Sequence, residues 1–234
     1  MPRELTTTPL AEPCRAKQML YGCLVPDPSD GRIRLWLTNM NETSGGELIA
    51  IDLENDTGEI YRWPAGHGSW HILPVSGDKL VISTYYDGKF IVFDMKTKTF
   101  PLVVDFPGES YIWNMAQGRD GRVYGGTYSG AKLGAFDLET GAFEDCGTAV
   151  AGTGDQYLRH VKATPSGDIA CTFGFAKKVF AVYKIRERKF VTLWEDDDVS
   201  PIVSLRGSLF VSSEQRGLVA LAGDEPWETE QPPL

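Results

Sequence analysis

The chain has 234 residues, of which 42% are hydrophobic and 11% aromatic, enough apolar material to bury a substantial core. Its 23 basic and 32 acidic residues give a net charge of −9, which argues against nucleic acid as a partner. No run of about 18 apolar residues is present, and the N-terminal MPRELTTTPLAEPCRAKQ lacks the apolar stretch of a signal peptide. We therefore expect a cytoplasmic protein that does not partner a membrane.

In chain order, five polar turns each lead into an apolar run that is typical of a strand. They begin SDGRIRLWL at Ser29, SGDKLVIST at Ser76, RDGRVYGGT at Arg119, SGDIACTF at Ser166 and RGSLFVSS at Arg206. Gly in these turns supplies the positive φ that a tight hairpin requires, because it has no Cβ to clash. No stretch shows helical periodicity with caps, so the sequence predicts an all-β chain.

A second hairpin follows each of these runs. Its five copies are GELIAIDLENDTGEI, GKFIVFDMKTKTF, AKLGAFDLETGAF, KKVFAVYKIRERKF and a worn GLVALAGDEPW. Asp52, Asp94 and Asp137 head three of the turns, and Tyr183 and Ala222 take that place in the others, at separations of 42, 43, 46 and 39 residues. Two hairpins in a repeat of this length predict a four-stranded propeller blade.

The residues LIAIDLENDTGEIYRW and LGAFDLETGAF resemble the repeats of PQQ-like (quinoprotein-type), YVTN and NHL β-propellers. In those families an aliphatic strand ends in Asp and turns through Thr-Gly. The resemblance covers residues 20 to 225 and implies a propeller of about five four-stranded blades over residues 21 to 234, preceded by an extension at residues 1 to 20. It marks architecture and implies no quinone cofactor.

Closure of the ring has two alternatives. In a closed ring, which we favour slightly, the segment from Arg15 to Tyr21 lends the outermost strand to the last blade, and the protein is a monomer. In the other, the chain is an incomplete arc of a larger propeller. Its exposed sheet edges would then pair with another chain, as in a structural scaffold of a larger assembly.

Alignment of the repeats predicts where a site would lie. Counting nine residues back from the first apolar residue after each inner turn gives one position in the innermost strand of every blade: Leu24, His71, Asn114, His160 and Ser200. The position before it carries Trp70, Trp113 and Arg159. The loops on the same face carry Tyr85, Tyr128 and Glu214, and together these residues predict a shallow bowl with aromatic walls.

Three functions fit this bowl. The first is a binding domain for a small polar molecule, a glycan or a protein partner, held by the aromatic and polar residues just named. The second is a metal-dependent lyase or lactonase-type hydrolase, similar to the gluconolactonase and streptogramin lyase propellers. His71, His160 and Asn114 would hold one divalent ion there, and an imidazole or Tyr85 or Tyr128 would move the proton. The third is the scaffold.

Several residues carry structural expectations. Trp70 and Trp113 fit a wedge between neighbouring sheets as well as a site, and Trp36, Trp63 and Trp194 are expected in the core. The four cysteines show no metal-ligand spacing, and we expect free thiols. The acidic run from Glu195 to Asp198 lacks the alternation of a calcium loop and is expected to be solvated.

Overall fold

The computed structural model describes residues 19–40, 45–175, 179–195, 199–205, 208–222 and 225–227. These residues form strands joined by turns and loops, in agreement with the all-β prediction. A helix long and apolar enough to span a membrane is not found in this part of the chain.

The strands form five four-stranded antiparallel sheets, each built from four consecutive strands, which we call blades 1 to 5 in chain order. Blade 1 contains β1 (Met19–Pro26), β2 (Ile33–Asn39), β3 (Glu47–Asp52) and β4 (Thr57–Arg62). Blade 2 contains β5 (Ser69–Val75), β6 (Lys79–Thr84), β7 (Lys89–Asp94) and β8 (Thr99–Asp105), and blade 3 contains β9 (Tyr111–Gln117), β10 (Val123–Tyr128), β11 (Leu133–Phe136) and β12 (Phe143–Gly147). Blade 4 contains β13 (Leu158–Ala163), β14 (Ile169–Phe173), β15 (Val179–Lys184) and β16 (Lys189–Trp194), and blade 5 contains β17 (Val199–Leu205), β18 (Ser208–Ser213), β19 (Gly217–Ala222) and β20 (Glu225–Trp227).

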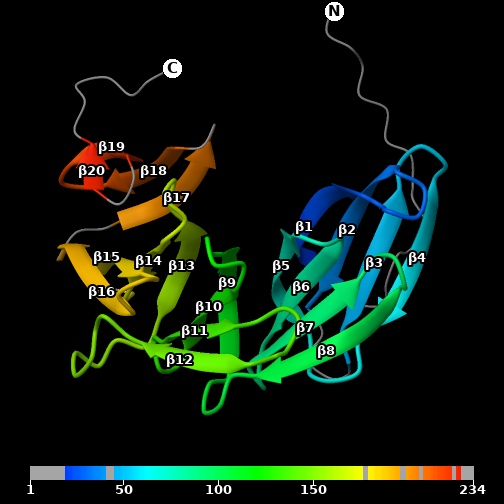
Figure 1. The fold of residues 1–234 in the computed structure, drawn as a ribbon, viewed down its shortest axis with the longest axis horizontal. Helices are drawn as coiled ribbons and strands as arrows, with labels where there is room; N and C mark the ends of the chain where they lie inside the picture. The colour runs from blue at the N-terminus through cyan, green and yellow to red at the C-terminus, as the bar shows by residue number, and fades with distance from the viewer. Residues whose placement is uncertain are drawn as a thin grey trace, which may run out of the picture.

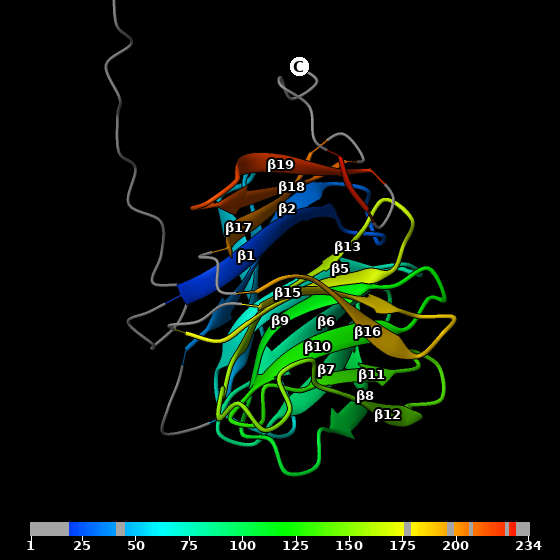
Figure 2. The same ribbon diagram turned by 90° about the vertical axis from the view of Figure 1, so that its left-hand side faces the viewer.

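The blades follow one another around an axis, with the first strand of each blade innermost (Figure 1). β1 contacts β5, β5 contacts β9, β9 contacts β13, and β13 contacts β17. The fourth strands lie outside, and β4 is exposed along most of its length. Figure 2 shows the succession from inner β9 to outer β12 within blade 3.

The recurring aspartates have a local cause. Asp52, Asp94 and Asp137 each use Oδ1 to accept hydrogen bonds from the backbone N–H groups two and three residues further on, at 2.7 to 3.1 Å. Such an Asx turn closes the hairpin between the third and fourth strands. The N–H of Thr97 and that of Thr140 are the main cause that lowers the pKa of Asp94 and Asp137, respectively.

Blades are held together by apolar contact between their faces. Four clusters of buried hydrophobic residues form, one for each pair of successive blades. In the cluster between blades 1 and 2, Trp36 packs with Leu80 and Phe93, and Trp36 is fully buried. Trp63 and Trp194 also lie in these clusters, which confirms the core placement of all three tryptophans.

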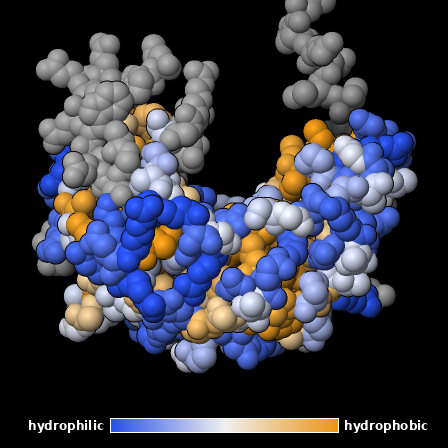
Figure 3. All heavy atoms as spheres, in the orientation of Figure 1, coloured by the Kyte–Doolittle hydropathy of each residue, from blue (hydrophilic) through white to orange (hydrophobic). Residues whose placement is uncertain are grey.

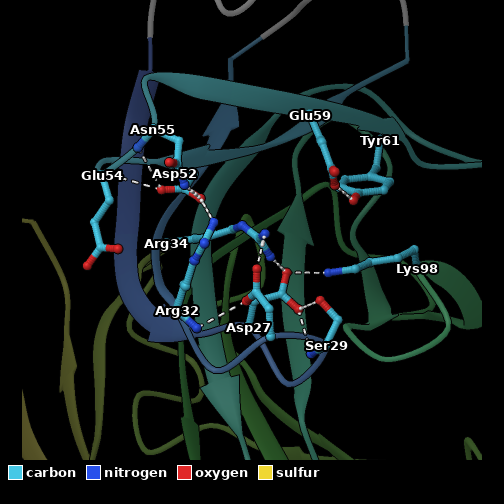
Figure 4. Close-up of polar contacts among 11 residues, drawn as sticks. Asp27, Ser29, Arg32, Arg34, Asp52, Glu54, Asn55, Glu59, Tyr61 and Lys98 are labelled. Atoms are coloured by element: carbon cyan, nitrogen blue, oxygen red, sulfur yellow. Dashed lines mark hydrogen bonds and ion pairs between the residues drawn. The ribbon is translucent and has the colours of Figure 1, made fainter.

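A buried carboxylate adds a polar contact between blades 1 and 2 (Figure 4). Asp27, in the β1–β2 loop, is 0% exposed and accepts hydrogen bonds from Ser29 and from Arg34. It also pairs with Lys98, which lies in the β7–β8 turn of blade 2. A buried carboxylate needs cations as partners to offset its loss of hydration. Because one of its two cations comes from each blade, Asp27 joins blade 1 to blade 2.

The ring is open, contrary to the closed ring that the sequence slightly favoured. The two end blades stand apart on either side of a notch (Figures 1 and 3), and no apolar cluster joins blade 5 to blade 1 among the described residues. Met19 to Tyr21 begin the inner strand of blade 1 and pair with β2, whereas residues 15 to 18 lie outside the described range. Blade 5 has its own fourth strand, β20.

Cys23, Cys146 and Cys171 are free thiols, as expected, and Cys14 lies outside the described residues. Burial raises the pKa of the Cys23 thiol to about 12 and that of Cys146 to about 11. Asp196 to Asp198 of the acidic run also lie outside the described residues.

Candidate functional site

An aromatic cavity of about 320 Å³ opens on the face where the second strands end and the inner strands begin. This volume is within the range of ligand pockets, roughly 300 to 1,000 Å³. We call it the aromatic cavity, because seven of its eight lining side chains are Trp or Tyr. The lining residues are Met40, Trp70, Tyr85, Tyr86, Tyr111, Trp113, Tyr128 and Tyr157.

The repeat explains why these residues meet. Trp70 lies on β5, Tyr111 and Trp113 on β9, and Tyr128 at the end of β10. Antiparallel pairing within a blade brings the start of the inner strand beside the end of the second strand, so Tyr111 pairs with Tyr128. A bridge between Tyr85 and Tyr111 then connects blade 2 to blade 3.

The rings contact one another across three blades. Trp70 and Trp113 have ring centroids 4.4 Å apart, and the Tyr111 ring lies 6.0 Å from Trp113 and nearly parallel to it. Tyr157, just before β13, brings blade 4 into the cluster at 4.7 Å from the Tyr128 ring. Trp70 and Trp113 thus contact each other between the inner strands of blades 2 and 3 and line the cavity, and neither belongs to the apolar cluster that packs those two blades together.

Two features of the cavity cost free energy. The indole N–H groups of Trp70 and Trp113 are buried without a hydrogen-bond partner, and an unsatisfied buried donor costs about 1 to 3 kcal/mol. Tyr86, 47% exposed at the edge, has a φ of +71°, a left-handed conformation that is rare for an aromatic residue. Backbone strain of this kind gathers at functional sites.

Among the described lining residues, none has a formally charged side chain. A cation lies nearby, because the Arg159 guanidinium stands 5.1 Å from the ring centroid of Phe175, and the Phe175 ring is 5.6 Å from that of Tyr157. His67 approaches from the other side, with its ring edge-on to Tyr86 at 5.6 Å. The cavity can therefore offer aromatic faces, phenol hydroxyls and, at its margin, a positive charge.

The histidines of the predicted site lie outside the lining of this cavity. His71 is 3% exposed, packs edge-on against Tyr21 at 4.4 Å, and has a buried Nδ1 without a hydrogen-bond partner. Burial, with a smaller contribution from the charge of Lys162, lowers the pKa of His71 to about 3. The imidazole is therefore neutral at physiological pH.

Asn114 and His160 are engaged in the scaffold. The Asn114 side chain accepts a hydrogen bond from the backbone N–H of Val161 at 3.3 Å, which links blade 3 to the inner strand of blade 4. His160 Nδ1 lies 2.7 Å from the Thr172 hydroxyl. Within the described ranges, no three His, Cys, Asp or Glu side chains are grouped so that they could hold a metal ion. The metal site stays a prediction.

Blade 1 departs from the predicted alignment. Strand pairing makes Tyr21, rather than Leu24, the equivalent of His71, because Tyr21 pairs with Thr38 as His71 pairs with Ser83. The cause is the long β1–β2 connection, which shifts a count made at fixed spacing. Leu24 is 62% exposed and turned away from blade 2.

The structure thus brings together Trp70, Trp113, Tyr85 and Tyr128 of the predicted site. It places Arg159 near the margin, Glu214 in the exposed β18–β19 turn, and the side chain of Ser200 outside the described residues. Sequence reasoning missed Tyr111 and Tyr157 as site residues. Both stand two residues before an aligned position, Trp113 and Arg159, so the alignment held the signal.

Comparison with known proteins supports the fold. No protein-family model and no curated protein sequence matches the chain. Among solved structures, virginiamycin B lyase from Staphylococcus aureus gives a TM-score of 0.63 at 11% identity, over 90% of this chain and 70% of that one. The WD40 repeats of RRP9 give 0.63 at 12% identity, over 90% and 66%. The chain is a β-propeller arc.

A third match is the extracellular domain of a putative one-component system from B. thetaiotaomicron, with a TM-score of 0.65 at 13% identity over 88% of this chain. The match takes up only 27% of that chain, so the arc spans about a quarter of its length. Identities this low establish the propeller fold alone, and they do not distinguish the PQQ-like, YVTN and NHL types.

Proposed function

We propose that this propeller arc is a binding domain whose aromatic cavity takes a small polar molecule, a glycan or a segment of a protein partner. The chain has six tryptophans and nine tyrosines, and seven of these side chains line one cavity. This observation carries the proposal. Aromatic rings give large contact areas and can stack on sugar or peptide surfaces, while phenol hydroxyls orient polar groups.

Burial alone does not account for this gathering. A few tryptophans and tyrosines, such as Trp36 and Tyr124, also lie in the clusters between blades. The cavity differs because seven such rings from blades 2 to 4 line one open space, with two unpaired indole N–H groups among them and a left-handed tyrosine at its edge. Unpaired buried donors and strained backbone are features of functional sites, where binding of a ligand can offset their cost in free energy.

Enzymes and enzyme variants are among the solved structures of related shape. One is a catalytically inactive histidine-to-alanine variant of virginiamycin B lyase with quinupristin, at a TM-score of 0.64 and 12% identity. For this chain, a lyase or hydrolase activity remains a prediction of the sequence. The binding proposal rests on the cavity and needs no metal.

The test is a titration of the full chain followed by intrinsic tryptophan fluorescence, because two tryptophans line the cavity. Cellohexaose serves as the glycan probe and an octaproline peptide as the extended peptide probe. We expect saturable binding of at least one probe. Tyr86→Gly removes an exposed lining ring while keeping the backbone free of strain, and should weaken that binding by about tenfold.

Leu53→Gly is the matched control, because Leu53 is 50% exposed but lies in the β3–β4 turn and is not among the lining residues. It should bind as the unmodified chain does. Equal affinity in Tyr86→Gly and Leu53→Gly would place any binding elsewhere, and the absence of binding by both probes would count against the cavity as a site for these ligand classes.

A further inference from the structure

The aromatic cavity offers a ligand many ring atoms and few hydrogen-bonding groups. None of its described lining side chains is an amide, a carboxylate or a cation. The indole N–H groups of Trp70 and Trp113 are buried, so in this conformation both side chains present ring carbon atoms to the cavity. Burying the polar groups of a ligand without partners costs free energy. The lining therefore favours a ligand whose buried part makes few hydrogen bonds.

The rings line the cavity from several directions. Tyr85 and Trp113 lie nearly parallel to Tyr111, at 10° and 15°. Trp70, however, is inclined by 45° to Trp113, and Tyr128 is inclined by 72° to Tyr111. Rings inclined to one another form the walls of a cage around one compact group, in contrast to a flat stacking surface.

The seven rings also make the cavity attractive to a cation. Ring faces carry partial negative charge and attract cations, most strongly in tryptophan. The margin of this cluster already holds one, because the Arg159 guanidinium lies 5.1 Å from the ring centroid of Phe175, which contacts Tyr157. An ordinary ammonium group keeps N–H donors, for which the described lining side chains offer only phenol oxygens and a thioether sulfur. A quaternary ammonium group has no N–H donor to satisfy.

Charge beside the lining residues also favours a cation. The whole chain carries −9, which attracts cations over long range. The described charged residues within four positions of a lining residue along the chain are Asp87, Lys89, Glu109, Lys132, Asp155 and Arg159. Lys89 pairs with Asp105. Lys132 pairs with Asp145 at 3.0 Å and lies 4.0 Å from Glu109. With Asp105 and Asp145 included, five carboxylates therefore stand against three cations.

We propose that the ligand of the aromatic cavity carries a quaternary ammonium group, an inference that rests on the binding function proposed above. The rings would hold the trimethylammonium end, while the rest of the ligand extends out of the cavity. Two sources share this chemistry, a small molecule of the choline type and a trimethylated lysine in a protein partner. The same group without its methyl substituents should bind more weakly, because its N–H donors would lose their hydrogen bonds to water.

Isothermal titration calorimetry on the full chain tests the proposal with two probes of matched shape. One is choline, and the other is dimethylbutanol, the uncharged alcohol in which carbon replaces the nitrogen of choline. We expect saturable binding of choline and binding of the alcohol that is weaker by at least about tenfold, since only the cation interacts with the charge of the ring faces. Ethanolamine, which lacks the methyl groups, should also bind more weakly than choline.

Tyr157→Leu removes one lining ring and keeps an apolar side chain. It should reduce the preference for choline over the alcohol by at least about threefold. Phe175→Leu is the matched control, because Phe175 contacts Tyr157 but is not among the lining residues, and it should keep the preference. An unchanged circular dichroism spectrum confirms that each variant folds. A glycine-flanked trimethyllysine peptide that binds more tightly than choline would indicate a protein partner, and a preference for choline would indicate a small molecule.

Equal or tighter binding of the uncharged alcohol to the unmodified chain would overturn the proposal. An unchanged preference in folded Tyr157→Leu would also overturn it, because the cation would then bind elsewhere. Binding of cellohexaose or octaproline without any response to choline or the trimethyllysine peptide would overturn the quaternary ammonium ligand and leave the binding function in place. The absence of binding by all of these probes would count against both.

Discussion

His71 makes the stability of the fold depend on pH in a defined direction. Its pKa is about 3 in the folded chain, against an ordinary value of 6.5, because its ring is buried and lies near the charge of Lys162. A lowered histidine pKa means that the unfolded state binds the proton more readily. The stability linked to His71 is complete above pH 6.5 and is lost as the pH falls toward 3.

The magnitude follows from linkage. At pH 5 the imidazole is almost fully protonated in the unfolded chain and neutral in the folded chain. This pH lies about 1.5 units below the ordinary pKa of 6.5, and the free energy of unfolding falls in proportion to that interval. At about 1.4 kcal/mol per unit, the free energy of unfolding falls by about 2 kcal/mol between pH 7.5 and pH 5 because of this residue.

The perturbation is His71→Phe, which keeps a ring of similar size against Tyr21 and removes the titrating group. Urea unfolding at pH 7.5 and pH 5 should show that the unmodified chain loses about 2 kcal/mol more than the variant, with carboxylates contributing equally to both. Lys162→Met removes the second cause of the lowered pKa and should reduce the loss. Parallel pH profiles for the unmodified chain and His71→Phe would refute the reasoning.

Three further predictions concern single residues, each checked by urea unfolding at pH 7.5. Asp27→Ala leaves Arg34 and Lys98 without their shared carboxylate and should lower the free energy of unfolding by about 3 kcal/mol; a loss below about 1 kcal/mol would show that both cations reach water instead. Gly88→Ala should cost about 3 kcal/mol or more, because Gly88 has a φ of +51° and a Cβ there would lie 2.3 Å from the carbonyl oxygen of Glu109; an unchanged midpoint would mean that this loop moves freely. Tyr86→Gly should change stability by less than about 1 kcal/mol, since relief of the left-handed backbone offsets lost ring contacts, and a large loss would contradict a binding role for that strain.

Much of the fold was predictable because its causes are local. The hairpins recur where Gly, Asp and Asn close turns, and the Asp52 carboxylate accepts hydrogen bonds from residues only two and three positions away. Strand alternation needs no distant partner either. Alignment of the repeats matches Trp70 with Trp113 and Tyr85 with Tyr128. Four residues of the cavity could therefore be named from spacing alone.

The alignment was wrong where one hairpin departs from the common length. The β1–β2 connection of blade 1 holds the Asp27 cluster and is longer than the connection of blade 2. A count at fixed spacing therefore reached Leu24 instead of Tyr21. No local signal marks this shift, because the register is decided by pairing across the two strands.

The sequence by itself determined that this chain forms strands, that the strands group into five blades, and which residues share a level around the axis. Only the tertiary structure decided that the ring stays open among the described residues, and that seven aromatic rings meet at one cavity while His71 and His160 pack into the scaffold. The physical reason is that turns and strand alternation depend on residues close in the chain. Closure of the ring and the meeting of the aromatic side chains depend instead on how the apolar faces of blades, which lie more than a whole repeat apart in the sequence, pack against each other.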